Sequence, residues 1–221
     1  MLMSGLGALI VFGICGLSGF FVVADERRGH AEAAERTSGP DGIRSRSVDP
    51  EPLTLQEVFP DPEIRVLPGA AYSIEMTHID TDCDIAATGR LGDVLSDHAC
   101  SQVVRASITA PYGGYRVTAG VFNLADAADA ALVGEQAGHL VETGGGTFAA
   151  MASHGPGTDP LDQPLAQIGW REHGHYLVYC VISRPDGLVV NDEDAFARRI
   201  TADLVESYLV EEILGRRESS T

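Results

Sequence analysis

Two arginines are the residues whose spacing most directly suggests a binding chemistry. Arg105 and Arg116 fall in two runs expected to form neighbouring strands, 102–109 and 115–124, joined by a Pro-Tyr-Gly-Gly turn. Guanidinium groups on adjacent strands can contact an anionic ligand, because their planar N–H donors match carboxylate and phosphate oxygens. Such arginines more often pair with carboxylates on the protein surface. Both interpretations stay open at this point.

Three cysteines lie beyond the N-terminal apolar run: Cys83, Cys100 and Cys180. Cys83 and Cys100 bracket an expected helix, so their side chains can meet, and a disulfide between them adds about 3 kcal/mol in the loop-entropy model. Cys180 falls in the middle of an apolar run, as a buried core thiol does. The alternative is three reduced thiols in a cytosolic domain. We expect the Cys83–Cys100 disulfide, and no redox site because the chain has no C-x-x-C motif.

Two stretches invite a metal interpretation. The acidic run 80–84 begins like a calcium loop, but Ile85 and Leu91 stand where an EF-hand requires Gly and Glu. An acidic turn that caps a helix is the better interpretation. His173 and His175 flank a glycine at an expected hairpin turn, where exposed histidines with a turn function are simpler than a metal pair without a third ligand.

Nucleophilic and phosphate-binding chemistry has weak support. His98 and Ser101 flank Cys100 and could join one of many aspartates in a triad, yet no G-x-S-x-G elbow is present. The Thr-Gly-Gly-Gly-Thr stretch at 143–147 lacks the lysine of a phosphate loop. The sequence therefore predicts no catalytic residue, no metal ligand and no cofactor.

Hydrophobic periodicity predicts the elements that position these residues. Alternating or continuous apolar runs are typical of strands, and apolar residues three to four positions apart are typical of helices. The run 176–182 is apolar at every position, which predicts a strand buried on both faces near the centre of the sheet. We expect strands at 72–78, 102–109, 115–124, 148–153, 165–172 and 175–183, and helices at 84–97, 126–141 and 191–216.

This order of elements predicts an α+β fold, an antiparallel sheet with about three helices packed on one face. The last helix is the longest. We expect Asn191 to cap it and Arg216 to lie near its end. Its apolar stripe is expected to comprise Phe196, Ile200, Leu204, Leu209 and Ile213.

The composition excludes one class of partner. The formal net charge is −17, and all 15 basic residues are arginine. Nucleic acid binding needs a basic surface, so no nucleic acid partner is expected. The same acidic surface repels anionic lipid headgroups, so the folded domain is expected to stand off the membrane.

The N-terminal run from Leu2 to Ala24 contains no charged residue and is long enough to cross a bilayer as a helix. A cleaved signal peptide is the rival interpretation, but no basic stretch precedes the run and no A-x-A cleavage site follows it. We therefore expect a transmembrane anchor at 1–24, a disordered acidic linker rich in Pro and Gly at 25–53, and one globular domain at 54–217. The domain is expected to begin with a capping box, Thr54 with Glu57.

Two signals disagree on which side of the membrane the domain lies. Arg27, Arg28 and Arg36 follow the apolar run, and the positive-inside rule taken alone places them in the cytoplasm. The cysteines fit an oxidising compartment better. We expect a single-pass protein of the cell membrane with an extracytoplasmic domain.

The stretches 99–106 (Ala-Cys-Ser-Gln-Val-Val-Arg-Ala) and 117–121 (Val-Thr-Ala-Gly-Val) resemble actinobacterial single-pass membrane proteins of unknown function with one extracytoplasmic α+β domain. The composition is similar too: it is rich in Ala, Gly and Asp, and arginine takes the place of lysine throughout. The resemblance covers about 53–217. It implies a location and transfers no catalytic residue.

Three functions are compatible with these observations. The first is a membrane-anchored sensor, accessory or binding domain whose partners are the bilayer, through Leu2 to Ala24, and another membrane or envelope protein. The second is an extracytoplasmic hydrolase-type enzyme with a site assembled from scattered His, Asp and Ser residues. The third is a scaffold that faces the cytoplasm.

Overall fold

The computed structural model describes residues 41–151, 166–191 and 193–220 of the 221-residue chain. From Gly42 onward these residues belong to one compact unit, Gly42–Thr221. The predicted anchor from Leu2 to Ala24, and most of the predicted linker, lie outside the described residues. Nowhere in the described ranges is there a helix with the length and apolar character that a bilayer span requires.

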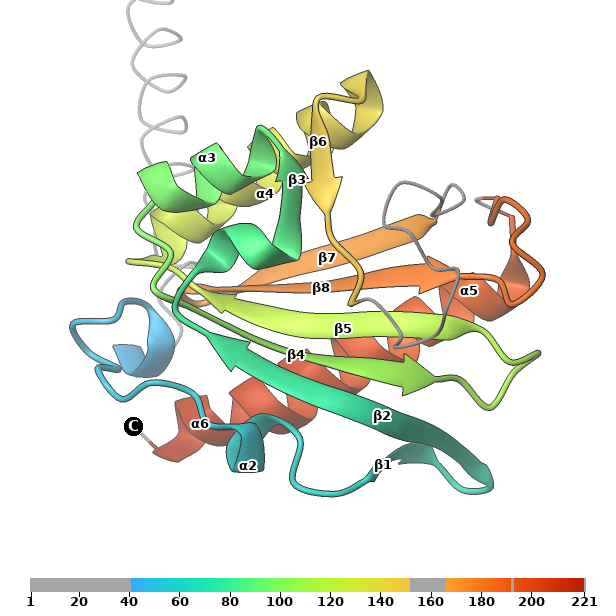
Figure 1. Cartoon of the computed structure of the whole chain (residues 1–221). Helices are drawn as coiled ribbons and strands as arrows, with labels where there is room; N and C mark the ends of the chain where they lie inside the picture. Colours follow the sequence, from blue (N-terminus) through green and yellow to red (C-terminus); the bar gives the residue numbers. More distant parts are fainter. Residues whose placement is uncertain (1–40, 152–165, 192, 221) are drawn as a thin grey trace, which may run out of the picture. The chain divides into compact units, whose positions relative to one another are not determined.

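The unit is built on a six-stranded sheet in which every neighbouring pair is antiparallel. The predicted α+β class with an antiparallel sheet is confirmed. The strand order is β1-β2-β4-β5-β8-β7, as Figure 1 shows. The strands are β1 (Glu63–Leu67), β2 (Ala70–Asp80), β4 (Gln102–Thr109), β5 (Arg116–Asn123), β7 (Gln167–His173) and β8 (Tyr176–Ser183).

Both predicted hairpins form. Strands β4 and β5 pair along their full length, and β7 and β8 do the same on the far side of β5. The predicted strand at 72–78 is the middle part of β2. Strand β8 is buried from Tyr176 to Ile182, as its continuous apolar run predicts, although it lies next to the edge strand β7 and not at the centre.

Helices cover both faces of the sheet, so the prediction that they cover one face is wrong. Helices α3 (Leu91–Asp97) and α4 (Ala127–Thr143) lie on one face. The other carries one continuous helix made of α5 (Ala195–Thr201), the π-helical stretch η4 (Ala202–Leu214) and α6 (Gly215–Ser220). The two layers are visible on either side of the strands in Figure 1. The cause is the apolar character of β8 on both of its faces, because each face needs an apolar cover.

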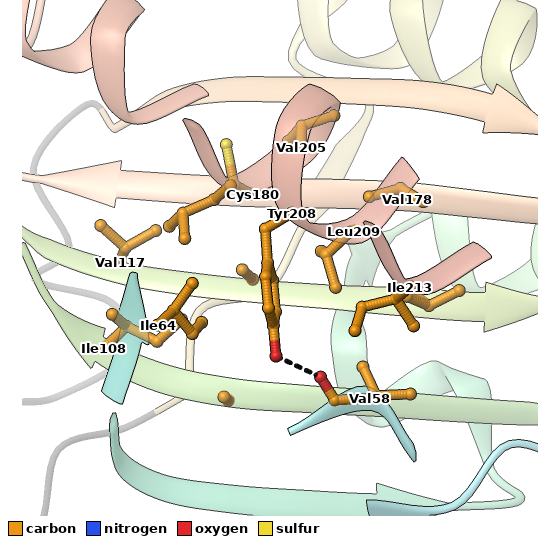
Figure 2. Packing of buried hydrophobic residues seen from close by; sticks show 14 of the residues in the cluster. Val58, Ile64, Ile108, Val117, Val178, Cys180, Val205, Tyr208, Leu209 and Ile213 are labelled. Atoms are coloured by element: carbon orange, nitrogen blue, oxygen red, sulfur yellow. Dashed lines mark hydrogen bonds between the residues drawn. The ribbon is translucent and has the colours of Figure 1, made fainter. Parts of the chain in front are cut away.

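Alternation along the strands divides the interior into two cores. Val178, Cys180 and Ile182 face the long helix, whereas Leu177 and Tyr179 face α3 and α4. Figure 2 shows the first core, in which the ring of Tyr208 reaches across and its hydroxyl donates to the carbonyl of Val58 at 2.7 Å. In the second core the rings of Tyr179, Phe122 and Phe148 form a cluster, with Tyr179 4.9 and 5.1 Å from the two phenylalanines and the phenylalanines 6.0 Å apart.

The predicted helix at 84–97 is interrupted. The structure has a 3-10 turn, η2 (Cys83–Ala86), then the short strand β3 (Ala87–Gly89), and only then α3. Strand β3 pairs with β6 (Gly146–Phe148), which shares only Phe148 with the strand expected at 148–153. Residues 149–151 are not in a strand, and residues 152 and 153 lie outside the described residues. Gly89 has a φ of +58°, and a Cβ atom there would collide with the carbonyl oxygen of Gly145, so the close pairing requires glycine.

The last helix begins at a different cap from the one predicted. Asp194 accepts hydrogen bonds from the backbone N–H groups of Phe196 and Ala197, whereas Asn191 accepts from Glu193 in the turn before the helix. Helix α4 agrees better with its prediction, because Asp126 caps its start and Gly144, in the left-handed conformation, ends it. The predicted capping box of Thr54 and Glu57 is present at α2 (Leu55–Val58).

The linker predicted at 25–53 is too long, because residues 42–53 pack against the domain. Ile43 and Leu53 are buried, and Gln102 exchanges two hydrogen bonds with the backbone of Leu53. Asp49 is only 4% exposed. The sequence did not reveal this packing, because the segment has no apolar period and is fixed by polar contacts to residues far along the chain.

Asp49 is held by the C-terminal helix and by strand β8. Arg217 donates to both of its carboxylate oxygens at 2.7 Å, and Tyr176 donates to one of them at 2.7 Å. A second carboxylate, Glu57, accepts from Arg217 at 2.6 Å. Burial alone would raise the pKa of Asp49, but the hydrogen bonds from Arg217, Tyr176 and His175 outweigh burial and lower it.

The predicted disulfide forms between Cys83 and Cys100, whereas Cys180 is a buried free thiol. The bridge joins the start of η2 to the residues that lead into β4. It therefore closes the segment that contains β3 and α3. Burial raises the pKa of the Cys180 thiol to about 11, which keeps it protonated and unreactive.

The lowered pKa of Asp49 predicts how stability depends on pH. The ionised carboxylate stabilises the fold above its unfolded pKa, and this contribution is lost as the pH falls through the lower pKa of the folded state. Asp49→Asn should cost about 3 kcal/mol at pH 7 because it leaves a buried guanidinium without its main partner. The difference from the wild type should shrink below about pH 4, as measured by urea unfolding. Glu75→Gln, at an exposed strand position, is the control, and an Asp49→Asn effect that is independent of pH would contradict this account.

Candidate functional site

A cleft of about 490 Å³ opens at the end of the sheet where three separate segments meet. The segments are the β1–β2 turn, the β4–β5 turn and the start of α5. Figure 1 shows these turns together at one end of the strands. The cleft is open to solvent and is not an enclosed cavity. The residues that line it are Leu67, Pro68, Gly69, Ala70, Tyr112, Ala195, Phe196 and Arg199.

Antiparallel topology brings these segments together. Strands β2 and β4 are neighbours, so the turn before β2 and the turn after β4 lie at the same end of the sheet. Strand β8 also ends there, and α5 is the next helix along the chain. Gly69, with a φ of +86°, allows the tight β1–β2 turn that forms one wall of the cleft.

Aromatic rings form a second wall. Tyr112 stacks on Phe196 with ring centroids 5.9 Å apart and an angle of 14° between the planes. Tyr72 meets Tyr112 edge-on at 6.1 Å, and Tyr115 lies 6.2 Å from Phe196. Phe196 nevertheless remains 52% exposed. It was predicted to belong to the core stripe of its helix, and the structure places it on the open side of the cleft.

Asp203 lies beneath this wall and accepts three hydrogen bonds. The hydroxyl of Tyr72 donates to its Oδ2 at 2.8 Å, that of Tyr112 donates to the same oxygen at 3.4 Å, and Nε of Arg199 donates to Oδ1 at 2.9 Å. Burial, together with the hydrogen bond to Asp203, raises the pKa of Tyr72. The hydrogen bond to Asp203 also raises the pKa of Arg199. The group therefore consists of two phenols and a guanidinium around one carboxyl group.

The loop at the rim of the cleft is fixed by a second polar group. Tyr115 donates to Asp194 at 2.7 Å, and Arg184 donates to Asp186 at 2.6 Å and lies 3.9 Å from Asp194. The hydrogen bond from Arg184 lowers the pKa of Asp186 to about 2. Between these anchors, Leu188 is 61% exposed. The rim is thus a restrained loop that presents an apolar tip to solvent.

The two arginines predicted to contact an anion lie on one face of the β4–β5 hairpin but not side by side. Arg105 is opposite Gly120 and Arg116 is opposite Thr109, so four residue positions separate them, or about 13 Å at the rise of a strand. Arg105 is buried and donates to the carbonyl of Ile85 at 2.9 Å. A shared anion site on this pair stays a prediction.

Gly120 explains how Arg105 fits in the sheet interior. A Cβ atom at Gly120 would lie 2.8 Å from both Arg105 and the ring of Tyr179. The missing side chain therefore lets an arginine and a tyrosine approach across three strands. Burial raises the pKa of Tyr179 to about 12, against the opposing effect of the Arg105 charge.

The histidine candidates are separated in the structure. His175 is completely buried, with Nε2 3.2 Å from Asp49 and Nδ1 3.1 Å from the carbonyl of Leu124, so the prediction that it is exposed is wrong. His173 lies 3.3 Å from Glu218. Across the described ranges there is no group of three or more His, Cys, Asp or Glu residues arranged to hold a metal ion.

His98 and Ser101, considered above as possible members of a catalytic triad, contact different partners. His98 Nδ1 is 2.8 Å from Asp129, but its Nε2 faces Gln136 at 3.2 Å. The Ser101 hydroxyl donates to the carbonyl of Asn123. The acidic run at 80–84 forms a capping turn, as predicted, in which Asp82 accepts from the N–H of Asp84.

No family model, curated protein or solved structure matches the chain. Function therefore has to be inferred from the geometry of the cleft. Two local signals in the sequence point toward it. Tyr112 is an aromatic residue within a Pro-Tyr-Gly-Gly turn, where burial is not expected, and Arg199 with Asp203 is an i,i+4 pair on the face of a helix that should be apolar.

The two tyrosines that bond to Asp203 should contribute unequally to stability. Tyr72→Phe removes a buried 2.8 Å hydrogen bond and should lower the free energy of unfolding by about 1–2 kcal/mol. Tyr112→Phe removes a longer contact in the open cleft and should cost less than about 0.5 kcal/mol. Urea denaturation of both variants checks this order. Equal losses, or a larger loss for Tyr112→Phe, would mean that Tyr72 does not hold Asp203 as described.

Proposed function

We propose that this chain is a membrane-tethered binding domain, held outside the cytoplasm, that engages another envelope or membrane protein through the cleft at the end of its sheet. Its role is that of a sensor or accessory module. The observation that carries the proposal is the cleft itself. In it the exposed ring of Phe196 stacks on Tyr112, and the partly exposed guanidinium of Arg199 is fixed by Asp203.

The location is supported by two independent features. The apolar run from Leu2 to Ala24 has the length of a bilayer span. The disulfide between Cys83 and Cys100 is typical of oxidising compartments and rare in the cytosol. Together they favour a domain tethered on the outer side of the membrane.

The exposed apolar side chains at the cleft support a role in binding another protein. Among the described residues seven large hydrophobic side chains are exposed. Two of them, Leu67 and Phe196, line the cleft, and two more, Leu188 and Val189, lie between β8 and α5. Exposed apolar groups that gather around a cleft mark interaction sites, whereas scattered ones carry no such meaning. Aromatic residues and arginine are also the types most enriched at the centres of protein interfaces.

Counting thiols tests the location. Cells are quenched in acid, and the denatured full-length protein is labelled with a maleimide polymer that shifts its gel mobility. Without reductant only Cys15 and Cys180 should react, and after reduction all four cysteines should react. Labelling of all four thiols without reductant would contradict an oxidising compartment.

Crosslinking in living cells tests the binding site. A photoreactive amino acid replaces Leu188 at the rim of the cleft or Leu132 in α4, two residues that are similarly apolar and exposed. Only the substitution at 188 should give defined higher-mass adducts, and Phe196→Ala should reduce them severalfold, because it removes the exposed side chain of the aromatic wall. Adducts at both positions, or at neither, would overturn the assignment of the cleft as the binding site.

A further inference from the structure

We propose that the cleft accepts a segment of a partner protein in which an apolar side chain stands next to a carboxylate, with Arg199 binding that carboxylate. This inference rests on the proposed function and specifies the chemistry of the partner. It follows from how Arg199 is held, what surrounds it, and how open the cleft is to solvent.

The guanidinium of Arg199 is presented to the cleft with one edge used and one edge open. Its Nε donates to Asp203, whereas Nη1 and Nη2 have no hydrogen-bond acceptor among the residues that the structure describes. The side chain is 46% exposed and lines the cleft. The two terminal nitrogens of a guanidinium form a fork that matches the two oxygens of a carboxylate.

Asp203 orients this fork and does not compete for the ligand. It is 5% exposed, and its two oxygens are occupied by Tyr72, Tyr112 and Arg199. Because the carboxyl group is fixed from three sides, the guanidinium that it anchors keeps a constant direction. A preorganised donor loses less conformational freedom on binding than a free surface arginine does.

The surroundings favour a single carboxylate over a polyanion. The chain carries a net charge of −17, and the rim loop itself bears Asp186, Glu193 and Asp194. An anionic membrane or a nucleic acid would bring many negative charges against this rim. One carboxylate aimed at one oriented arginine avoids that repulsion.

The apolar part of the ligand has a defined place. The stacked rings of Tyr112 and Phe196 form one wall, and Leu67 and Pro68 of the β1–β2 turn also line the cleft. Leu188 and Val189, which precede α5 in the sequence, are also exposed, although they do not line the cleft. A free fatty acid would bury its chain in an enclosed cavity, whereas this cleft is open to solvent and suits the side chains of a protein segment laid across it. The observations therefore favour a protein segment.

A double-mutant cycle between protein and peptide tests this chemistry. The full-length chain in zwitterionic nanodiscs is titrated with acetyl-Gly-Leu-Glu-Phe-Gly-amide and with the matched peptide in which Gln replaces Glu, and binding is followed by ligand-observed NMR. The Glu peptide should bind about tenfold more tightly, as expected for a charge-assisted bidentate contact. Arg199→Gln should remove that preference and leave the Gln peptide unaffected within about twofold.

Two variants separate the contact from general charge and from folding. Arg198→Gln removes a neighbouring arginine that donates to the Glu193 carbonyl and does not line the cleft, so the preference for Glu should persist. Arg199→Lys keeps a cation beside Asp203 but lacks the planar fork. Its preference for the Glu peptide over the Gln peptide should fall from about tenfold to less than about threefold. Phe196→Ala should weaken both peptides equally.

The outcomes distinguish this inference from the proposed function. Equal binding of the two peptides, or an equal effect of Arg198→Gln and Arg199→Gln, overturns the role of Arg199. Decanoate binding that depends on Arg199, in the absence of peptide binding, overturns the assignment to a protein segment. Failure of both peptides while position 188 still crosslinks in cells rejects the carboxylate chemistry alone, and failure of both experiments rejects the binding site itself.

Discussion

The structure depends on the burial of strand β8 on both of its faces. From Tyr176 to Ile182 every side chain is apolar and buried, so neither face of the sheet can be left to water. The long C-terminal helix covers one face, and α3, α4 and the β3–β6 pair cover the other. Both faces of the sheet are thus covered, and the cleft lies at one end of the strands, among their turns.

A second constraint ties the two ends of the domain together. Arg217, near the end of the chain, is held by Asp49 and Glu57, which lie close to the start of the compact unit. Burial alone would lower the pKa of Arg217, but its hydrogen bonds to Asp49 and Glu57 raise it, so Arg217 and Asp49 stay charged. The same logic recurs at the cleft, where buried Asp203 fixes Arg199. In both places a buried carboxylate sets the direction of an arginine, and only at the cleft does the guanidinium keep a side exposed to solvent for a ligand.

Local pattern predicted the parts of the fold that depend on neighbours in sequence. The period of two residues predicted the β4–β5 and β7–β8 hairpins, and the spacing of Cys83 and Cys100 around a short segment predicted their disulfide. The two-layer cover was missed, although the apolar run of β8 already required it. The packing of Asp49 and the aromatic cleft could not be predicted, because they join residues such as Tyr72 and Asp203 that are 131 positions apart. Phe196 fitted the apolar stripe of its helix, and only the tertiary structure shows that it faces outward.

The central claim is that an oriented arginine and an aromatic wall form one binding site. A crystal structure of the protein with the Leu-Glu-Phe peptide bound tests it most directly. The account predicts that the glutamate oxygens lie within hydrogen-bonding distance, about 2.7–2.9 Å, of Nη1 and Nη2 of Arg199, with an adjacent apolar side chain against Tyr112 and Phe196, and with the Arg199–Asp203 contact unchanged. A peptide bound elsewhere on the domain, or one in the cleft whose carboxylate points to solvent, would contradict it.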